Sequence, residues 1–366
     1  MYQPLTVKVI DLLHPSRRHC LAQLAACGLT AWGVPTVAAG ADASVLRVLA
    51  WPGYAEPEVV QAFERAHGVK VSVTVVDSDD TLWQRASGNG AGDFDVFAVN
   101  TAELQRYVTQ GLVSPVPADA VPNRRLQLPR FQDVARIGGL VHDGRVMAVP
   151  FTYAEMGLLY DRQRISQAPD TLGALWDQRY QGKVLLHNGG THNFSLAAQV
   201  LGNKNPFQLS PAQWPAAVDR LIALRRNSGG FYSQPDESVA LFKRKFAALM
   251  YANYGSQQLK LLQSAGLDVG YVIPKEGALA WLDCWAITAA SRNAQLAHQW
   301  INHLLEPQAA QALLERQGLA NTTSVPSHLT DTDRILWLEP VENVTRREQL
   351  WERILSGDRA SKVLAP

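Results

Sequence analysis

Hydrophobic and polar positions are arranged along the chain in blocks that predict strands and helices in turn. The runs 44–51, 69–76 and 95–99 are apolar and rich in β-branched residues, as in buried strands. Between them, 56–67 and 79–86 carry apolar residues at helical spacing. Strands that alternate with helices at this spacing indicate βαβ units and a largely parallel sheet.

Two side chains stand directly where these predicted strands end. Trp51 closes the first strand, and Asn100 follows the third. In parallel sheets, ligands bind beyond the carboxyl ends of the strands. The sequence therefore predicts that Trp51 and Asn100 face a ligand.

The middle of the chain predicts a second set of elements. They are helices at 172–176, 193–201 and 211–226, and strands at 182–186, 247–251 and 269–273. After residue 287, helices are expected at 291–304, 307–317 and 348–355, with too few strands to form a sheet.

This order of elements predicts an α/β protein of two lobes. The expected lobe 1 comprises 44–150 and 288–366, since the tail has no sheet of its own and must pack on an existing one. The expected lobe 2 comprises 151–287. The chain would cross between the lobes near 150–153 and near 283–287.

The segment 277–287 combines two tryptophans with a carboxylate. Alternation along a strand places Trp281, Asp283 and Trp285 on one face. An aromatic face beside a carboxylate suits a small organic cation, which gains π-contact and a charge-assisted hydrogen bond. The alternative is that both tryptophans are core residues and Asp283 is a cap or turn residue.

The first 43 residues have the pattern of an export signal. Arg17 and Arg18 precede an uncharged apolar run that ends in small residues, as in a cleaved periplasmic signal peptide. The arginine pair also resembles a twin-arginine signal, and Leu24-Ala-Ala-Cys27 resembles a lipobox that would anchor the protein through Cys27. The apolar run continues past Cys27, which favours cleavage after it. A membrane anchor is the remaining alternative.

Composition and motifs restrict the possible functions. The chain has 366 residues, 34 Lys and Arg against 33 Asp and Glu, and a net charge of +1, with basic residues scattered, so no nucleic-acid partner is expected. Beyond the export signal, Cys284 is the last of three cysteines and cannot form an internal disulfide. Signatures of esterases and zinc proteases are absent, so neither an enzyme nor a cofactor is expected. His187 and His192 are poor metal ligands without a third donor, so no metal is expected.

Several short motifs follow one another between residues 51 and 283, and their order and spacing are characteristic of a known family. They are Trp51-Pro-Gly-Tyr54, Gly92-Asp-Phe-Asp-Val96, Trp176-Asp-Gln-Arg-Tyr-Gln-Gly182-Lys, Asn253-Tyr-Gly-Ser256 and Pro274-Lys-Glu-Gly277 followed by Trp281-Leu-Asp283. In this order the chain resembles the spermidine/putrescine-binding group of periplasmic solute-binding proteins of ABC importers. The resemblance implies a type II periplasmic-binding fold: two lobes, each a mostly parallel sheet flanked by helices, joined by a two-crossover hinge. It also implies a ligand between the lobes, an inner-membrane permease as partner and a monomer.

The resemblance also implies which residues line the site. Trp51 and Tyr54 match aromatic positions of the ligand channel, and Trp281 and Asp283 match the pair that holds an amine. The further implied positions are Asn100 at a strand end, and Tyr251 or Asn253 near another channel aromatic.

Two acidic positions of the family are missing from this chain. Pro52 and Gly53 replace a polar and an acidic residue, and 187–192 replaces an acidic loop. A dication needs an anionic partner at each end, because burying an unpaired ammonium costs several kcal/mol. Glu155 is the hypothesised replacement, facing the cleft.

The sequence therefore predicts a periplasmic protein that binds a small cationic amine, such as putrescine or spermidine. The alternatives are an opine, an amino-acid-like amine, an aminophosphonate, thiamine or ferric iron on the same fold, or an exported hydrolase.

Overall fold

The structure is a computed structural model that describes residues 44–90, 92–326, 328–330 and 333–365. The predicted export signal and its Cys27 lie outside the described residues. No helix in these ranges is long and apolar enough to cross a membrane.

The first sheet collects strands from both ends of the chain. Its strands are β1 (Val45–Ala50), β2 (Lys70–Val75), β3 (Val96–Asn100), β4 (Val113–Ser114), β7 (Val149–Glu155), β13 (Ala278–Thr288), β14 (Ala320–Asn321) and β15 (Ile335–Trp337). Their order is β14-β7-β13-β3-β1-β2, and β4 and β15 also pair with β13. A separate ribbon is formed by β5 (Val141–His142) and β6 (Arg145–Val146). As predicted, β1 pairs in parallel with both β2 and β3.

Helices cover the first sheet, and those at 57–67, 79–86, 294–304 and 307–317 lie where apolar periodicity predicted them. They include α1 (Pro57–His67), α2 (Asp79–Ala86), α3 (Thr101–Thr109), α4 (Pro129–Gln132), α9 (Ala294–Leu304) and α10 (Pro307–Gln317). The first helix begins with a proline and ends at Gly68, whose left-handed φ of 65° closes it. Alternation along β13 is confirmed, since Trp285 and Leu282 belong to different hydrophobic clusters on its two faces.

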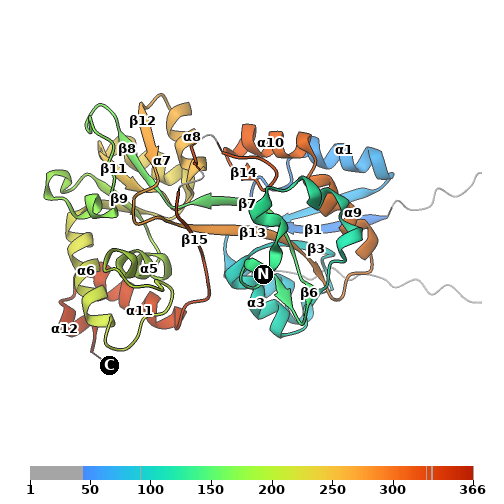
Figure 1. The fold of residues 1–366 in the computed structure, drawn as a ribbon, viewed down its shortest axis with the longest axis horizontal. Coiled ribbons are helices and arrows are strands. Elements are labelled where there is room, and N and C mark those ends of the chain that lie inside the picture. The colour runs from blue at the N-terminus through green and yellow to red at the C-terminus, as the bar shows by residue number, and fades with distance from the viewer. Residues whose placement is uncertain (1–43, 91, 327, 331–332, 366) are drawn as a thin grey trace, which may run out of the picture. The chain divides into compact units, whose positions relative to one another are not determined.

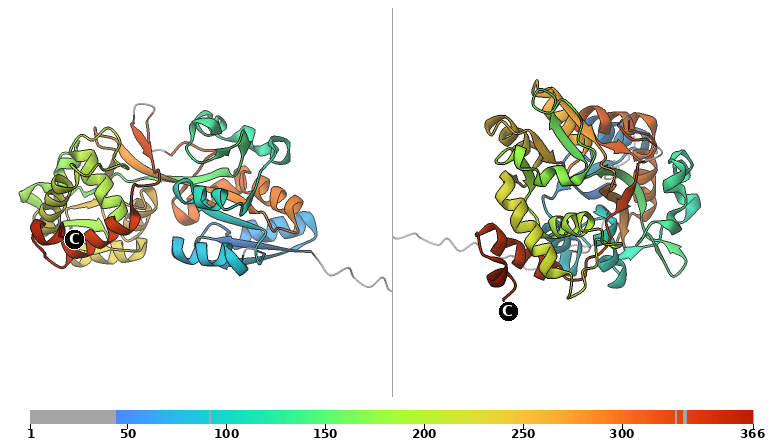
Figure 2. Two further views of the ribbon diagram at one scale, coloured as in Figure 1. Left: turned by 90° about the horizontal axis from the view of Figure 1, so that it is seen from below. Right: turned by 60° about the vertical axis from the view of Figure 1, so that its left-hand side comes forward.

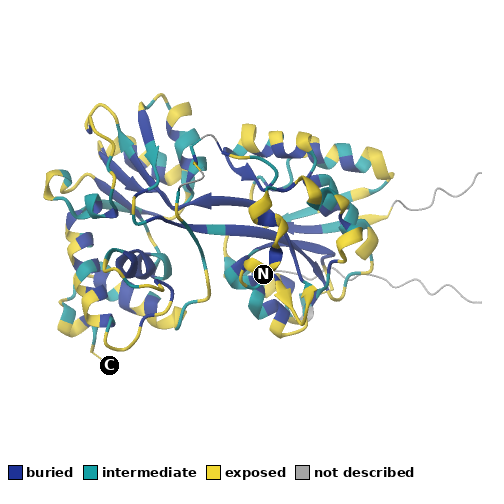
Figure 3. Cartoon of the chain, viewed as in Figure 1, coloured by how far each residue is buried: buried dark blue, intermediate teal, exposed yellow. Residues whose placement is uncertain are grey.

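The second sheet is built from the middle of the chain. Its order is β10 (Ser228–Tyr232), β9 (Val184–His187), β11 (Leu249–Tyr251), β8 (Leu158–Asp161) and β12 (Val269–Val272). It is flanked by α5 (Gly190–Val200), α6 (Trp214–Asn227), α7 (Pro235–Arg244) and α8 (Ser256–Ser264). The central strands of both sheets are buried, the edge strands β2 and β10 are partly exposed, and the outer faces of the helices are exposed (Figure 3).

Both sheets are mixed rather than mostly parallel. In the first, β13 pairs antiparallel with both β3 and β7. In the second, β8 pairs antiparallel with β11 and β12. The α/β class is as predicted, but β8 and β13, the strands that follow a passage from one sheet to the other, run antiparallel to these neighbours.

Within the described residues, the chain passes between the two sheets three times, not twice. The crossing segments are 156–157 between β7 and β8, 273–277 between β12 and β13, and 338–343 after β15 (Figures 1 and 2). The predicted crossings, near 150–153 and 283–287, instead fall within β7 and β13. These two long strands pair with each other over most of their length, which moves the crossings to their ends.

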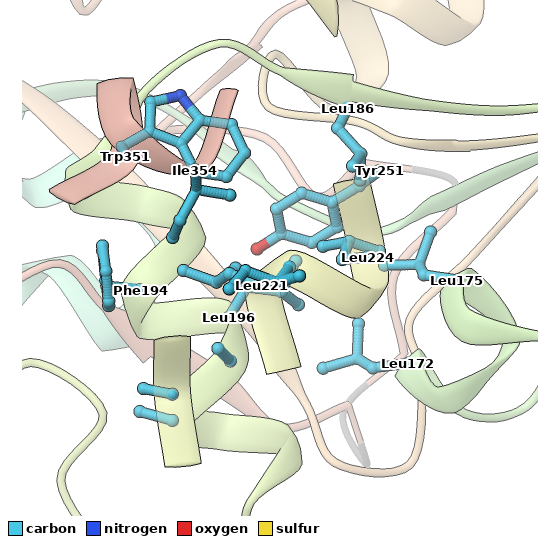
Figure 4. Packing of buried hydrophobic residues seen from close by; sticks show 14 of the residues in the cluster. Leu172, Leu175, Leu186, Phe194, Leu196, Leu221, Leu224, Tyr251, Trp351 and Ile354 are labelled. Atoms are coloured by element: carbon cyan, nitrogen blue, oxygen red, sulfur yellow. The ribbon is translucent and has the colours of Figure 1, made fainter. Parts of the chain in front are cut away.

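The C-terminal helices lie elsewhere than the predicted division of lobes placed them. Helices α11 (Val344–Leu355) and α12 (Ala360–Val363) pack on α5 and α6 of the second sheet. Trp351 and Ile354 enter the same core as Phe194 and Leu221 (Figure 4). Only α9 and α10 of the tail pack on the first sheet, through residues such as Trp300. The third crossing segment makes this exchange possible.

Candidate functional site

A cavity of about 890 Å³ is lined by residues of both sheets. On the side of the first sheet it is bounded by the carboxyl ends of β1, β2 and β3 and by β13. On the side of the second sheet it is bounded by the segment after β9, the starts of α5 and α7, and α8. The third crossing segment contributes Leu338, Glu339 and Val341.

Asp283 and Tyr54 form a buried pair on the wall of the first sheet. The Tyr54 hydroxyl donates a hydrogen bond to Asp283 Oδ2 at 2.5 Å. The Tyr54 ring is held edge-on by Phe151, with centroids 5.5 Å apart. Asp283 is 7% exposed. Burial raises the pKa of the Asp283 carboxyl to about 7, although the hydrogen bond from Tyr54 opposes the shift.

Asp79 brings a second carboxylate to the same wall. It is the first residue of α2, just beyond the end of β2. Asn100 Nδ2 donates to Asp79 Oδ1 at 3.2 Å, while Asn100 Oδ1 caps α3 by accepting from the N–H of Glu103. Burial, followed by the charge of Glu103, raises the pKa of Asp79 to about 7. The charge of Asp79 also raises the pKa of Asp283, so the two carboxyls are close enough to interact electrostatically.

The cavity is strongly acidic. Its lining carboxylates are Asp77, Asp79, Asp80, Glu103, Asp236, Asp283, Glu339 and Glu348. The one Lys or Arg among its described lining residues is Arg106, which bonds Glu103 at 2.9 Å and the Asp79 carbonyl at 3.1 Å. Its guanidinium also stacks on Trp83, 4.4 Å from the ring centroid. These eight acidic side chains, with a single arginine that is already paired within the protein, favour a cationic ligand.

The wall of the second sheet differs from the first in presenting two histidines close together. His187 and His192 lie with ring centroids 5.9 Å apart, and His192 Nδ1 contacts Asn253 Oδ1 at 2.8 Å. Burial lowers the pKa of His187 to about 3, with the neighbouring His192 adding to the shift, and burial also lowers the pKa of His192. These neutral imidazoles offer hydrogen bonds without charge.

Trp281 joins the two walls. It stands on β13 of the first sheet, and its indole N–H donates to the carbonyl of Asn253, beyond β11 of the second sheet, at 3.0 Å. The ring therefore lies fixed along the cavity rather than free in solvent. Within the described residues, no group of three or more His, Cys, Asp or Glu side chains is placed to hold a metal ion.

Comparison with known proteins agrees with this geometry. Residues 58–331 match a family model described as bacterial extracellular solute-binding protein. The chain belongs to this family. Its members transport solutes by binding them and are not classed as enzymes.

Relatives of this solute-binding protein include polyamine binders. It is 26% identical over 328 residues to the putrescine-binding periplasmic protein PotF of Escherichia coli (strain K12), covering 86% of each chain. It is 25% identical over 293 residues to the spermidine/putrescine-binding periplasmic protein 1 of Haemophilus influenzae, covering 78% of each. The fold matches the spermidine/putrescine substrate-binding protein PotD of Streptococcus pneumoniae with a TM-score of 0.71 at 18% identity, covering 88% of this chain and 99% of that one. The structural likeness shows that the fold is a type II periplasmic-binding fold.

The cavity of this solute-binding protein brings together most of the predicted site residues. Those that line it are Trp51, Tyr54, Asn100, Asn253, Trp281 and Asp283. Trp285, on the same face of β13, lies deeper, where it packs on Phe151 and Trp300 in the core. The proposed ligand roles of these residues remain predictions.

Two predicted site residues do not line the cavity. Tyr251 is buried in the core of the second sheet, with its hydroxyl 3.7 Å from Met156 Sδ (Figure 4). Glu155 is 1% exposed and contacts His328 Nε2 at 3.1 Å. Glu155 pairs across the strands with Ala280, the neighbour of Trp281, and so points to the opposite face from the cavity. The expectation that Glu155 faces the cleft is therefore wrong, whereas Asp79 does line the cavity with Asp283.

A signal for Asp79 was present in the sequence. The predicted strand 69–76 is followed by Asp77-Ser-Asp-Asp80. The rule that ligands bind beyond the carboxyl ends of parallel strands, which selected Trp51 and Asn100, applies equally to this third end.

Proposed function

We propose that this solute-binding protein captures a small aliphatic di- or polyamine, of the putrescine and spermidine class, in the cavity. It would act in the periplasm and deliver the amine to the permease of an ABC importer. The observation that carries the proposal is a pair of carboxyls, the buried Asp283 and the partly buried Asp79, which line the cavity together with the aromatic rings of Trp51, Tyr54 and Trp281. The relatives from Escherichia coli and Haemophilus influenzae, which are putrescine- and spermidine/putrescine-binding proteins, support the same class.

An ammonium group suits this wall in both shape and charge. Tyr54 uses Asp283 Oδ2, which leaves the other carboxylate oxygen for a ligand N–H. A hydrogen bond to a charged group contributes about 1.5–3 kcal/mol net. Each aromatic contact with the cation adds about 0.5–2 kcal/mol. One ammonium held by two carboxylates and three rings approaches the ~8 kcal/mol of micromolar binding.

Binding of an ammonium should release protons from the two carboxyls of the site. Burial keeps the pKa of both Asp283 and Asp79 near 7. An ammonium placed between them favours their ionised forms and lowers both pKa values. Binding near neutral pH therefore releases protons, which calorimetry detects as a dependence of the heat on the buffer.

Ligand binding also favours closure of the two lobes. The cavity has walls from both sheets, so a ligand that contacts both stabilises the state in which they are together. That closed state presents one composite surface to a permease.

Isothermal titration calorimetry tests the proposal directly. Putrescine and spermidine should bind with about micromolar Kd, whereas butylamine, which keeps one ammonium and the same carbon chain, should bind more weakly. Mass spectrometry of ligand released from the purified protein should identify an amine. Heat from a non-amine solute, with none from any amine, would sink the proposal.

A further inference from the structure

Glu348 lies at the amino end of α5, on the wall of the cavity that belongs to the second sheet, whereas Asp283 belongs to the first. Glu348 stands on α11 and lines the cavity. Its carboxylate accepts hydrogen bonds from the N–H groups of Gly190 at 2.9 Å and Thr191 at 2.8 Å, and from the Thr191 hydroxyl at 3.0 Å. Free N–H groups at a helix start are the donors that a bound anion uses. Here a carboxylate of the protein itself already uses them.

The approach of α11 to α5 is built into the sequence. A Cβ atom at Gly190 would lie 2.5 Å from the carbonyl oxygen of Arg347, so only glycine lets the two backbones come this close. The fully buried Arg347 donates to the Thr191 carbonyl at 2.9 Å and to Ser195 Oγ at 2.7 Å. These contacts hold Glu348 against the helix start.

Glu348 leaves a negative charge at this wall. A helix N-terminus carries about half a positive charge, which is less than the full charge of a carboxylate. Arg347 does not neutralise it, because its guanidinium pairs with Glu342 at 2.8 Å. Among the described residues, no Lys or Arg nitrogen forms an ion pair with Glu348. A ligand carboxylate here would meet a like charge and find the helix donors taken.

We propose that Glu348 is a specificity-determining residue that excludes solutes with a carboxylate at this end of the cavity. With an ammonium held by Asp283 and Asp79, the far end of the ligand would then be a second ammonium or an uncharged group. The protein would prefer a diamine over the ω-amino acid of the same length. This inference rests on the proposed function for the position of the first ammonium.

Matched pairs of ligands test the selection. Putrescine with 4-aminobutanoate, and cadaverine with 5-aminopentanoate, differ only in carrying an ammonium or a carboxylate at one end. The full mature protein should bind each diamine at least about 100-fold more tightly than its partner. In Glu348→Gln and Glu348→Ala, this ratio should fall at least about tenfold, because both variants remove the charge and Glu348→Ala also frees the α5 donors for the ligand.

The control is Glu352→Gln, which removes a carboxylate from an exposed position one turn further along the same helix. It should leave the ratio unchanged. Glu348→Gln keeps a side-chain oxygen for one N–H of α5, so it remains informative if Glu348→Ala does not fold, as thermal melting would show. An equal loss of affinity for both members of a pair would indicate a structural role and overturn the inference.

Failure of the inference and failure of the proposed function give different results. If the wild-type protein binds diamines tightly and Glu348→Gln leaves the ratio unchanged, the inference is wrong and the amine function stands. If the wild-type protein binds the ω-amino acids as tightly as the diamines, selection against carboxylates is likewise refuted. If it binds no amine at all, the proposed function itself fails.

Discussion

The two walls of the cavity differ in how they offer polar groups. The wall of the first sheet carries two carboxyls, the partly buried Asp79 and the buried Asp283, each with a pKa raised to about 7. The wall of the second sheet carries His187 and His192, whose pKa values are lowered so that both rings stay neutral near pH 7. Burial causes both shifts, and in both cases it favours the uncharged form.

The same burial has opposite consequences for a ligand. An incoming ammonium restores charge to the carboxyls and gains charge-assisted hydrogen bonds, which are stronger than neutral ones. The same ammonium gains only neutral hydrogen bonds from the imidazoles. The first wall is therefore expected to supply affinity, and the second, with Glu348 at its helix start, to supply selection among amines.

The largest effect is expected when the acidic wall loses its charge. The double substitution Asp79→Asn with Asp283→Asn should weaken putrescine binding at least about 100-fold, and each single change about tenfold or more. Calorimetry measures the loss, with Asp268→Asn as the control, since Asp268 is an exposed carboxylate paired with Arg162 on the second sheet. The double variant should remain folded at pH 8, because both substitutions remove carboxyls whose ionisation the surrounding protein disfavours when no ligand is bound. Unchanged affinity would remove both residues from the proposed site.

The affinity for the amine should depend strongly on pH, and this dependence should come from the carboxyls of the first wall alone. The ligand needs the ionised carboxylates, and their pKa of about 7 means that they are protonated at lower pH. Affinity should therefore fall about 30-fold per carboxyl between pH 8 and pH 5.5, while the amine, like a lysine, stays protonated throughout. His187, with a pKa of about 3, adds nothing in this range. A slope that persists in the double Asn variant would assign the pH dependence to the other wall.

A smaller effect separates the two tryptophans of β13. Trp281→Leu removes a ring that lines the cavity and should weaken binding about tenfold, with little change in stability. Trp285→Leu removes a ring packed in the core and should lower the free energy of unfolding by about 2–4 kcal/mol, with binding little changed. Calorimetry and chemical denaturation measure the two effects. The reverse result would mean that Trp285, and not Trp281, lies against the ligand.

The smallest effect concerns a contact between helices of the two walls. Lys260 of α8 donates to the carbonyls of Leu314 and Glu315 near the end of α10, the former at 3.1 Å. A lysine at a helix C-terminus contributes about 0.3–1 kcal/mol, so Lys260→Met should weaken binding about two- to fivefold. The change should appear as faster ligand dissociation in stopped-flow measurements. Lys243→Met, at an exposed position on α7, is the control, and an equal effect of both would discount the contact.

The sequence by itself determined the elements and the side chains with local signals. Apolar periodicity located β1, β2 and β3 with their helices, because burial of one face follows from spacing alone. The ends of those strands identified Trp51 and Asn100, and alternation along β13 put Trp281 and Asp283 on one face. The residues of the first wall were therefore largely foreseeable.

Tertiary structure decided which distant groups share a space. Glu155 looked suitable by position, but the pairing of β7 with β13 turns it towards His328, since side chains alternate and register decides the face. The amphipathic pattern of α11 predicted a helix without naming the surface that it covers, and only packing on α5 brings Glu348 to the cavity. Spacing along the chain reports burial of a face. It carries no information on what that face meets, because this depends on contacts between residues far apart in the sequence.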